Sequence, residues 1–569
     1  MSFFTKGTIC TLLILACLLQ ACAGASHKSP QKNTDLQRLR MSMSREPQSL
    51  DPRKGAEVVS ASLHFLLFEG LTRFNADWTV SLSSAETVDI SEDKKTYCFH
   101  LRESYWSDGS RVTAHDFAYA WKKVLDPSFP SPNAHLFYPI KNAEKSKRGL
   151  CGSDEIGIRA IDAHTLVVEL SSPTPYFLQL TSFCAFFPVQ QKIDTLDPSW
   201  ALAHDQHFVC NGPFHLVEWN NMRSIRLVRN PFYWDKEKIA LDEIEFLLLS
   251  DGMTALHLFE KNQLDLIQFS LCPLPADCLS FLREKEEFYT EPAAGSVIIA
   301  FNTRQFPFNN SKLRRSFSLA LDRQLIVDNI TQLNEEPAYS VVPPILINNV
   351  HHQLLPEGPS AKARFLLREA LTELGLASPK DLSVTYLYSA SDINKKTAET
   401  VQMLLRKNLG LEIDLQAMEH GSLLSSLNKK RFEMVQTVWI AQYNDPMNIL
   451  ERFKSQDNAK NYSGWEDPLF SLLLERSSLE TGAARLNTLL QAEERLVEEM
   501  PVIPLYHLNA SYLKKSYVKN LISPYSSNLC YAWISDKEKC EMQHGKNFEF
   551  ALRCAPKPAC AFSQPDTRR

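Results

Sequence analysis

No apolar run in this 569-residue chain is long enough to cross a lipid bilayer, a crossing that takes about 20 residues as a helix. An excess of basic charge is also missing, because 61 basic side chains face 66 acidic ones and the formal net charge is −5. Nucleic-acid-binding surfaces need a basic face, so we expect no nucleic-acid partner. A body of this size is too large for one hydrophobic core, and more than one compact region is expected.

Motifs that bind nucleotide phosphates or activate a nucleophile are missing as well. The sequence has no Gly-x-x-x-x-Gly-Lys-Ser/Thr loop, no His-Glu-x-x-His and no Gly-x-Ser-x-Gly. Paired Cys-x2-Cys spacing, which zinc sites use, is absent. The close histidine pairs, His204 with His207 and His351 with His352, would need further ligands to hold a metal. We therefore expect no enzyme activity, no metal and no cofactor.

The N-terminus carries a processing signal. Lys6 is the only charge before residues 8–19, which are nearly all apolar and have the length of a secretory h-region. Leu19-Gln20-Ala21-Cys22 is similar to a bacterial lipobox, with Cys22 as the lipidated first residue of the mature chain. Ile14-Leu15-Ala16-Cys17 is a weaker second candidate, and an ordinary signal without lipid is the alternative. We expect residues 1–21 to be a lipoprotein signal peptide and Cys22 to carry acyl chains such as palmitate.

Cysteines are frequent for a chain that would meet an oxidising compartment. There are 13 cysteines, and most lie beyond the expected signal peptide. Cys272 and Cys278 are close enough in sequence to bridge a short loop, whereas Cys98, Cys184 and Cys210 are typical of buried thiols. Spacing alone does not determine the pairing. We expect the polar residues 22–37 to form a flexible tether and residues 541–569 to form a Cys- and Pro-containing tail.

Alternating strand and helix patterns in the second half of the chain indicate an α/β fold. Residues 361–374 have helical apolar spacing and end at Gly375, a residue suited to a helix C-terminus. Residues 382–388 alternate as a strand, 394–408 are helical, and 411–415 form another strand pattern. Strand, helix and strand with short links predict a βαβ unit with parallel strands.

Other segments carry clear local signals. We predict strands at 39–43, 97–101 and 296–301, and helices at 58–71, from Thr113 to Trp121, and at 311–330.

Short motifs, spread in order along the chain, resemble those of bacterial oligopeptide-binding proteins, the extracytoplasmic receptors of peptide ABC importers. These motifs lie at 45–52, 67–71, 106–109, 112–117, 211–214, 229–234, 301–303, 321–323, 439–446 and 503–506. The resemblance covers roughly residues 39–535. One such motif would be weak, but this many in order make the assignment specific.

The resemblance implies a two-lobed α/β periplasmic-binding-protein fold of the large cluster, with an extra subdomain and a hinge between the lobes. Ligand would lie in the cleft, and the lobes would close over it. Lobe I would comprise 38–69, 190–294 and 507–540, the extra subdomain 70–189, and lobe II 295–506.

Family members hold an extended peptide by β-type hydrogen bonds to its backbone, with the peptide side chains in hydrated pockets. By this resemblance, segment 296–300 would supply one backbone partner and Trp439 an aromatic wall. The ligand-binding residues that we expect are Trp439, Gln442, Tyr443, Asn444, Asp445, Glu57, Val297, Ile298, Ile299, His420 and Gln436.

The chain departs from the family pattern at positions that, in the family, contact charged groups of the peptide. Gln442 stands where the family has an aspartate that pairs with the peptide's α-ammonium group, and a buried pair that loses one partner costs about 3–5 kcal/mol. Other contact positions move away from charge and aromatic character in the same direction: Leu427 and Gln436 replace arginines, His420 an indole, Ser318 a lysine, and Asn133 a tyrosine.

Two interpretations of this departure remain open. Charge could come from elsewhere, namely from Glu57, from Asp445, or from the basic residues 429–431. Asp445 precedes Pro446 and also has the pattern of a helix N-cap. Alternatively, the ligand is a modified, branched or cell-wall-derived peptide whose ends are not a simple ammonium and carboxylate.

The function that the resemblance implies is capture of oligopeptides and their delivery to ABC permease subunits that work with a separate ATPase. We expect a monomer in the periplasm, anchored to a bacterial membrane by lipid. The alternatives are a scavenger or sensor of modified or wall-derived peptides, and a secreted hydrolase with an unrecognised site.

Overall fold

The computed structural model describes residues 36–55, 57–75, 78–202, 208–350, 352–456, 458, 460–521 and 533–534. From Arg38 onward the chain forms one compact unit, separate from the segment that ends at Gln37. The expected signal peptide, Cys22 and the tail 541–569 lie outside the described residues. Within the described ranges, no helix has both the length and the apolar character that a membrane crossing requires.

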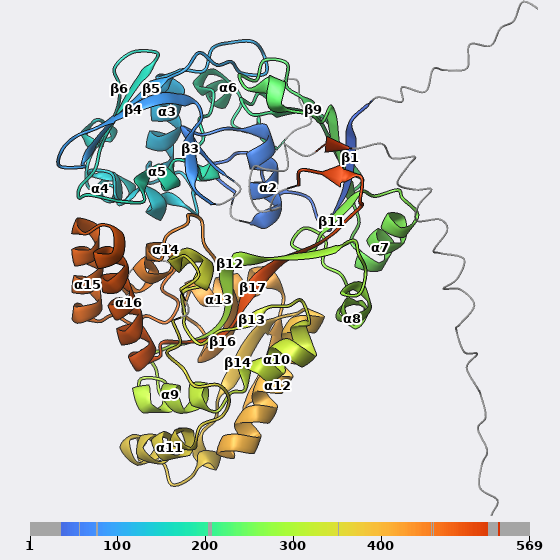
Figure 1. Ribbon diagram of the computed structural model, residues 1–569. Helices are drawn as coiled ribbons and strands as arrows, with labels where there is room; N and C mark the ends of the chain where they lie inside the picture. Colours follow the sequence, from blue (N-terminus) through green and yellow to red (C-terminus); the bar gives the residue numbers. More distant parts are fainter. Residues whose placement is uncertain are drawn as a thin grey trace, which may run out of the picture. The chain divides into compact units, whose positions relative to one another are not determined.

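The main sheet has eleven strands and joins segments from both ends of this unit (Figure 1). Its order is β15 (Asp414–Met418), β14 (Thr385–Ser389), β16 (Met434–Ile440), β12 (Phe288–Phe301), β17 (Val502–Lys514), β11 (Leu266–Gln268), β1 (Arg38–Met43), β10 (Glu243–Leu248), β9 (Ser224–Arg229) and β8 (Phe214–Asn220), with β13 (Glu336–Pro337) paired to β17.

The long strands β12 and β17 connect the two halves of this sheet. They run antiparallel along most of their length, with β14–β16 on one side and β11, β1 and β10 on the other. Their register shifts between Pro292 and Ser296, where β12 advances four residues while β17 advances two. A bulge of this kind bends a strand and increases its local twist. The bend coincides with the expected passage from lobe I to lobe II, although the exact boundaries stay a prediction.

Gly295 lies inside this bend and is required there by close approach. A Cβ atom at this position would lie 2.7 Å from the carbonyl oxygen of Trp439 on the neighbouring strand. Only glycine allows β12 and β16 to approach so closely.

The predicted βαβ unit is confirmed. Strands β14 and β15 pair in parallel and are connected by α12 (Asp392–Leu409). The buried face of α12 includes Val401, Leu404 and Leu405. Helix α11 (Ala361–Leu374) ends at Gly375, whose φ of 70° is the left-handed conformation that glycine adopts without strain.

The prediction of a single helix at 311–330 is wrong. The structure has α9 (Ser311–Leu319), a break, α10 (Arg323–Ile326) and a π-helical turn at Val327–Thr331. Asp322 leaves the helical conformation, and its carboxylate accepts a 3.0 Å hydrogen bond from the backbone N–H of Leu325. The side chain therefore caps a new helix, a competing signal that apolar periodicity does not reveal.

A second sheet lies within the expected extra subdomain, in the order β4 (Ala85–Ile90), β5 (Thr96–Leu101), β7 (Thr165–Glu169) and β6 (Ile158–Ala160). Helix α3 (Ala114–Val124) begins where predicted, because Thr113 and Asp116 form a capping box.

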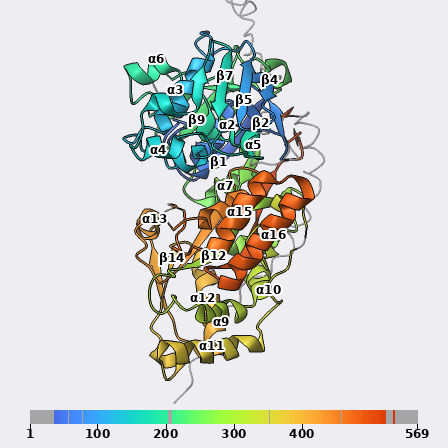
Figure 2. The same ribbon diagram turned by 90° about the vertical axis from the view of Figure 1, so that its left-hand side faces the viewer.

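The remaining helices cover these sheets, and α15 (Pro468–Leu479) and α16 (Gly482–Glu499) lie side by side in both views (Figures 1 and 2). The other elements used below are α2 (Val58–Leu67), β2 (Thr72–Phe74), the 3-10 turn η1 (Ala134–Phe137), α5 (Phe177–Leu180), α13 (His420–Asn428) and α14 (Met447–Leu450). Further short elements are β3 (Val80–Leu82), α4 (Ala143–Lys147), α6 (Gln191–Leu196), α7 (Gly252–Glu260), α8 (Leu279–Leu282), β18 (Val518–Lys519) and β19 (Trp533–Ile534).

Candidate ligand-binding site

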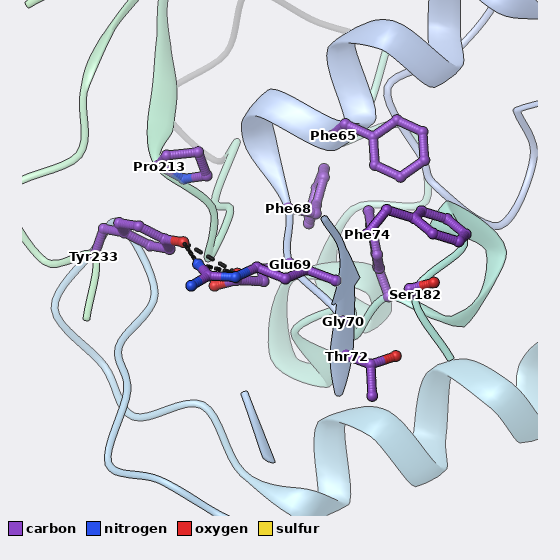
Figure 3. Close-up of a pocket in the computed structure, with 11 residues that line it drawn as sticks. Phe65, Phe68, Glu69, Gly70, Thr72, Phe74, Ser182, Pro213 and Tyr233 are labelled. Carbon is purple, nitrogen blue, oxygen red and sulfur yellow. Dashed lines mark hydrogen bonds and ion pairs between the residues drawn. The ribbon is translucent and has the colours of Figure 1, made fainter. Parts of the chain in front are cut away.

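Several sequence motifs meet at Glu69 and hold the scaffold together. Tyr233 and Trp234 donate hydrogen bonds of 3.0 and 2.7 Å to the Glu69 carboxylate, and Arg73 lies 3.6 Å from it. Figure 3 shows Tyr233 directed toward Glu69 beside a small cavity. Its volume of about 20 Å³ has room for roughly one water molecule. Burial raises the pKa of Glu69, and the arrangement is structural rather than a ligand site.

Two asparagines of the motifs connect further backbone segments to the cluster around Glu69. Asn211 exchanges two hydrogen bonds of 3.0 Å with the backbone of Glu69. Asn230 donates a 2.9 Å bond to the carbonyl of Gly212. A Cβ on Gly212 would lie within 2.5 Å of the Leu67 backbone. These contacts explain why the motifs at 67–71, 211–214 and 229–234 occur together.

Trp439, at the end of β16, is buried rather than exposed to a cleft. Its side chain is 3% exposed, its ring centroid lies 5.2 Å from that of Phe453, and the Arg452 guanidinium sits 5.2 Å above the ring. The neighbouring side chains of Val438 and Ile440 are exposed, because successive residues of a strand point to opposite faces.

One backbone edge of β16 has no strand partner among the described residues. Every residue of β16 pairs with β12 on one edge. On the other edge β14 pairs only with Met434 and Val435, which leaves residues 436–440 unpaired there. An unpaired edge of this kind is a template for a further strand.

Segment 296–300, an expected backbone partner of the ligand, lies inside the main sheet. This part of β12 is paired on one edge with β16 and on the other with β17. The side chains of Val297, Ile298 and Ile299 are buried. The edge without a strand partner in the described residues belongs to the neighbouring strand β16, and ligand contact by segment 296–300 stays a prediction.

A cavity adjoins this edge and the following loop. Its volume is about 110 Å³, and α2 and the end of β16 contribute to its wall. Its lining residues are mostly apolar: Val58, Ala61, Ser62, Phe65, Leu66, Phe74, Trp78, Phe183, Phe246, Gln268, Leu271, Ile440, Ala441 and Gln442. Apolar walls with a few polar groups are typical of ligand pockets.

Residues 442–444 bind segments of the expected extra subdomain. The side-chain amide of Gln442 donates a 3.0 Å hydrogen bond to Oδ1 of Asn133. The ring of Tyr443 stacks on Tyr176 with centroids 4.7 Å apart and 7° between planes. Asn444 donates a 3.4 Å bond to the carbonyl of Trp78. The expected site residues 442–444 are thus brought to one place, beside the cavity.

The two carboxylates considered as substitutes for the family aspartate already have partners. Asp445 is buried and forms two hydrogen bonds of 2.7 and 2.8 Å with Arg485, while also accepting a 2.9 Å bond from the backbone of Met447. Glu57 caps α2 through bonds of 2.8 and 2.9 Å to the N–H groups of Val59 and Ser60. Arg45 lies 3.6 Å from Glu57.

Other expected contact positions lie apart from residues 442–444. His420 is exposed at the first position of α13. Gln436 is buried and bonded to Tyr386 at 3.0 Å and Asn394 at 2.9 Å. Leu427 and Ser318 are buried in the interior. Of the basic residues 429–431, Lys430 donates a 2.9 Å bond to the carbonyl of Gln456, while Lys429 and Arg431 are exposed.

The thiols and candidate metal ligands offer no second site among the described residues. The described cysteines, Cys98, Cys151, Cys184, Cys210, Cys272 and Cys278, are free, so the possible bridge between Cys272 and Cys278 is absent. Burial raises the pKa of Cys184 and of Cys210 to about 12. Within these residues, no group of His, Cys, Asp and Glu is arranged to hold a metal ion. The pair at 204 and 207, and residue 351, lie outside the described part of the chain.

Comparison with known proteins gives the family. The sequence model described as "Bacterial extracellular solute-binding proteins, family 5 Middle" matches residues 79–461. The chain belongs to this family. Oligopeptide-binding protein OppA of Bacillus subtilis is 34% identical over 522 residues, which cover 90% of this chain and 96% of OppA. The periplasmic murein peptide-binding protein MppA of Escherichia coli is 30% identical, with 83% of this chain and 88% of MppA covered.

Solved structures of family 5 proteins have the same fold. Haemophilus influenzae OppA in complex with the peptide RPPGFSPFR has a TM-score of 0.78 and 25% identity, over 88% of this chain and 99% of that one. Escherichia coli murein tripeptide-binding protein MppA has a TM-score of 0.77 and 28% identity, with the same coverage. The expected two-lobed α/β periplasmic-binding fold is confirmed.

Sequence reasoning missed two residues that the family 5 fold places near Gln442. Arg452 follows α14 and was not singled out, although its guanidinium contacts both Trp439 and the backbone of Ile440. Asn448 bonds to Arg452. A buried arginine at the end of an apolar helix was the available signal, because such a charge needs a partner.

Proposed function

We propose that this protein is an extracytoplasmic receptor that captures oligopeptides and delivers them to the permease of an ABC importer with a separate ATPase. The observation that carries this proposal is the unpaired edge of β16 at residues 436–440, next to the cavity formed with α2. An extended peptide can add to such an edge as a further strand, so that backbone hydrogen bonds supply affinity for many sequences. Relatives named for oligopeptide binding support the same ligand class.

Closure over the peptide would use the bend in β12 and β17. These two strands carry the chain between the halves of the main sheet, and the register shift at Pro292 to Ser296 is a point where a small backbone change rotates one half. Residues 442–444, which already contact the 70–189 region through Asn133, Tyr176 and Trp78, would form part of the closed interface.

The finer features of this assignment rest on the sequence. We propose that Cys22 is lipidated, with palmitate among its acyl chains, and that the mature protein works as a periplasmic monomer on a bacterial membrane. The lipobox-like Leu19-Gln20-Ala21-Cys22 supports the anchor. We propose no catalytic role for any residue.

A second candidate is a binder of modified or cell-wall-derived peptides that acts as scavenger or sensor. The observation that favours it is the absence of a free carboxylate at the amino-terminal anchor in the described part of the chain. Gln442 is bonded to Asn133, and the nearby acids Asp445 and Glu57 are occupied by Arg485 and by the α2 N-terminus. A relative named for murein peptide binding is consistent with this candidate.

A thermal-shift comparison distinguishes the two. The protein is heated with one mixed pentapeptide pool whose N-termini are either free or acetylated. A stabilising shift with free amines alone supports the ordinary importer function, because the ammonium group is then read. Equal or larger shifts with acetylated peptides support modified or wall-derived ligands. No shift with either pool contradicts peptide binding itself.

A further inference from the structure

Arg452 carries a buried positive charge that no acidic side chain neutralises by an ion pair in the described residues. It is 9% exposed. Its Nε donates to the Asn448 carbonyl at 3.1 Å, and Nη2 donates to the Ile440 carbonyl at 3.2 Å and to Asn448 Oδ1 at 3.3 Å. All three acceptors are neutral. Glu451, the adjacent acid, accepts instead from the Tyr443 hydroxyl at 3.1 Å.

Two further buried groups beside Arg452 are hydrogen-bond donors without an acceptor in the described structure. The indole Nε1 of Trp439, whose ring lies under the guanidinium, and the amide Nδ2 of Asn448 have no partner there. The Asn448 oxygen is already bonded to Arg452, so only its donor remains. Both residues are at most 3% exposed. Buried donors are rarely left without a hydrogen-bond acceptor, and both of these unsatisfied groups are donors.

Lys460 adds a second cation to this environment, and His135, from another part of the chain, lies close enough to feel both charges. Burial lowers the pKa of Lys460, and the charge of Arg452 lowers it further. Burial, followed by the charges of Lys460 and Arg452, lowers the pKa of His135 to about 3. His135 lies in η1, two residues after Asn133, the partner of Gln442. His135 is therefore neutral at ordinary pH, and the positive charge of this region comes from Arg452 and Lys460.

We infer that this protein takes a carboxylate of its ligand beside Arg452, Asn448 and Trp439, close to Gln442. The inference rests on the proposed function, peptide capture, and adds the chemical class of the group that is read. Arginine suits the task, since its planar guanidinium matches a carboxylate. The site is connected to the cavity wall, because the carbonyl that accepts from Arg452 belongs to Ile440, a lining residue.

The carboxylate could come from an acidic side chain or from the C-terminus of a peptide. Four peptides distinguish these sources: acetyl-Asp-Ala-Ala-Ala-amide, its isosteric Asn counterpart, acetyl-tetra-alanine with a free carboxyl end, and the same peptide amidated. The first differs from the second by one charge on a side chain. The third differs from the fourth by one charge at the end.

Isothermal titration calorimetry of the purified full chain measures all four, together with free-amine tetra-alanine. We expect one charged peptide to bind about tenfold or more tightly than its neutral match, as hydrogen bonds to a charged group allow. In Arg452→Gln this ratio should fall to about one. Lys454→Gln is the matched control, because Lys454 is exposed and pairs with Glu475 at the surface, and it should keep the ratio.

A second variant protects the test against loss of folding in Arg452→Gln. Lys460→Gln removes a less buried charge of the same region. It should lower the affinity ratio of charged to neutral peptide by about threefold, because Lys460 is a neighbour of the carboxylate rather than a direct contact. Equal binding of charged and neutral peptides overturns the carboxylate inference and leaves peptide capture standing. Failure of all five peptides to bind overturns the proposed function, and the carboxylate inference falls with it.

Discussion

Gln442 and Asn133 are 309 positions apart in the chain and share one hydrogen bond of 3.0 Å between their side-chain amides. Both residues depart from the pattern that the family resemblance implies, Gln442 standing in place of an aspartate and Asn133 in place of a tyrosine. Asn133 in turn donates a 2.8 Å bond to the carbonyl of Gly55. The two altered positions are therefore bonded to each other, and the proposed amino-terminal anchor lies at this pair.

The first prediction concerns the charge at this position. Gln442→Asp should tighten binding of free-amino peptides relative to acetylated ones by about tenfold, because a buried carboxylate would then face the ammonium group. Calorimetric titration with both peptide forms checks it. Gln442→Asn is the control, since it has the length of aspartate without the charge. Unchanged selectivity would show that another group already reads the amino end.

The second prediction concerns the buried pair of Asp445 and Arg485, whose atoms approach to 2.7 Å. Asp445→Ala should lower the free energy of unfolding by about 3–5 kcal/mol, because it leaves the arginine charge buried without a partner. Urea denaturation measures this loss. The double variant Asp445→Asn with Arg485→Gln should recover part of it, and a double variant as unstable as Asp445→Ala would contradict the explanation.

The third prediction is a pH dependence that originates at Glu493. Burial raises the pKa of this carboxyl to about 7 from its ordinary value of 4.5, even though it accepts backbone bonds from Val341 and Val342. The folded state therefore binds the proton more tightly than the unfolded state. Stability from this group is present below pH 4.5 and is lost as pH rises through about 7.

Glu493→Gln should remove the loss of stability at high pH, because glutamine keeps the acceptor oxygen without the charge. We expect the variant to gain about 1–3 kcal/mol over the wild type at pH 8 and little at pH 4.5. Denaturation at the two pH values measures the difference. Glu498→Gln, at an exposed position further along α16, serves as control, and an equal gain at both pH values would contradict the role of Glu493.

The fourth prediction tests the anchor. Cys22→Ala should release the protein from membranes, because the acyl chains that we propose to anchor it could no longer be attached. Fractionation of cells into membrane and soluble material, followed by detection of the protein, checks the result. Cys17→Ala is the matched control at the weaker candidate position. Membrane association that persists in Cys22→Ala would contradict the proposed lipid anchor.

Local elements of the fold could be predicted from the sequence because their signals are local. The helix that ends at Gly375 and the parallel unit of β14, α12 and β15 follow from apolar periodicity and a terminal glycine. The break at Asp322 could not be predicted in this way, since a capping side chain competes with the periodicity on either side of it.

The candidate site depended on relationships that periodicity does not contain. Residues 442–444 were found through the family resemblance, and the structure brings them together. The partner of Asp445 lies forty residues away at Arg485, and the free edge of β16 exists only because β14 stops pairing after Val435. Strand ends and distant ion pairs are tertiary properties, so the unpaired edge of β16 could not be predicted from periodicity.

Gly295 allows the bent strand β12 to lie directly against the end of β16. At this residue β12 lies against Trp439 and Ile440 of β16, the strand whose other edge would receive the peptide, and the bend toward the second half of the sheet begins here. If a peptide adds to the other edge of β16, as we propose, it lies one strand away from this bend, and the close contact at Gly295 joins the two strands there. A side chain at position 295 would push β12 and β16 apart at this point.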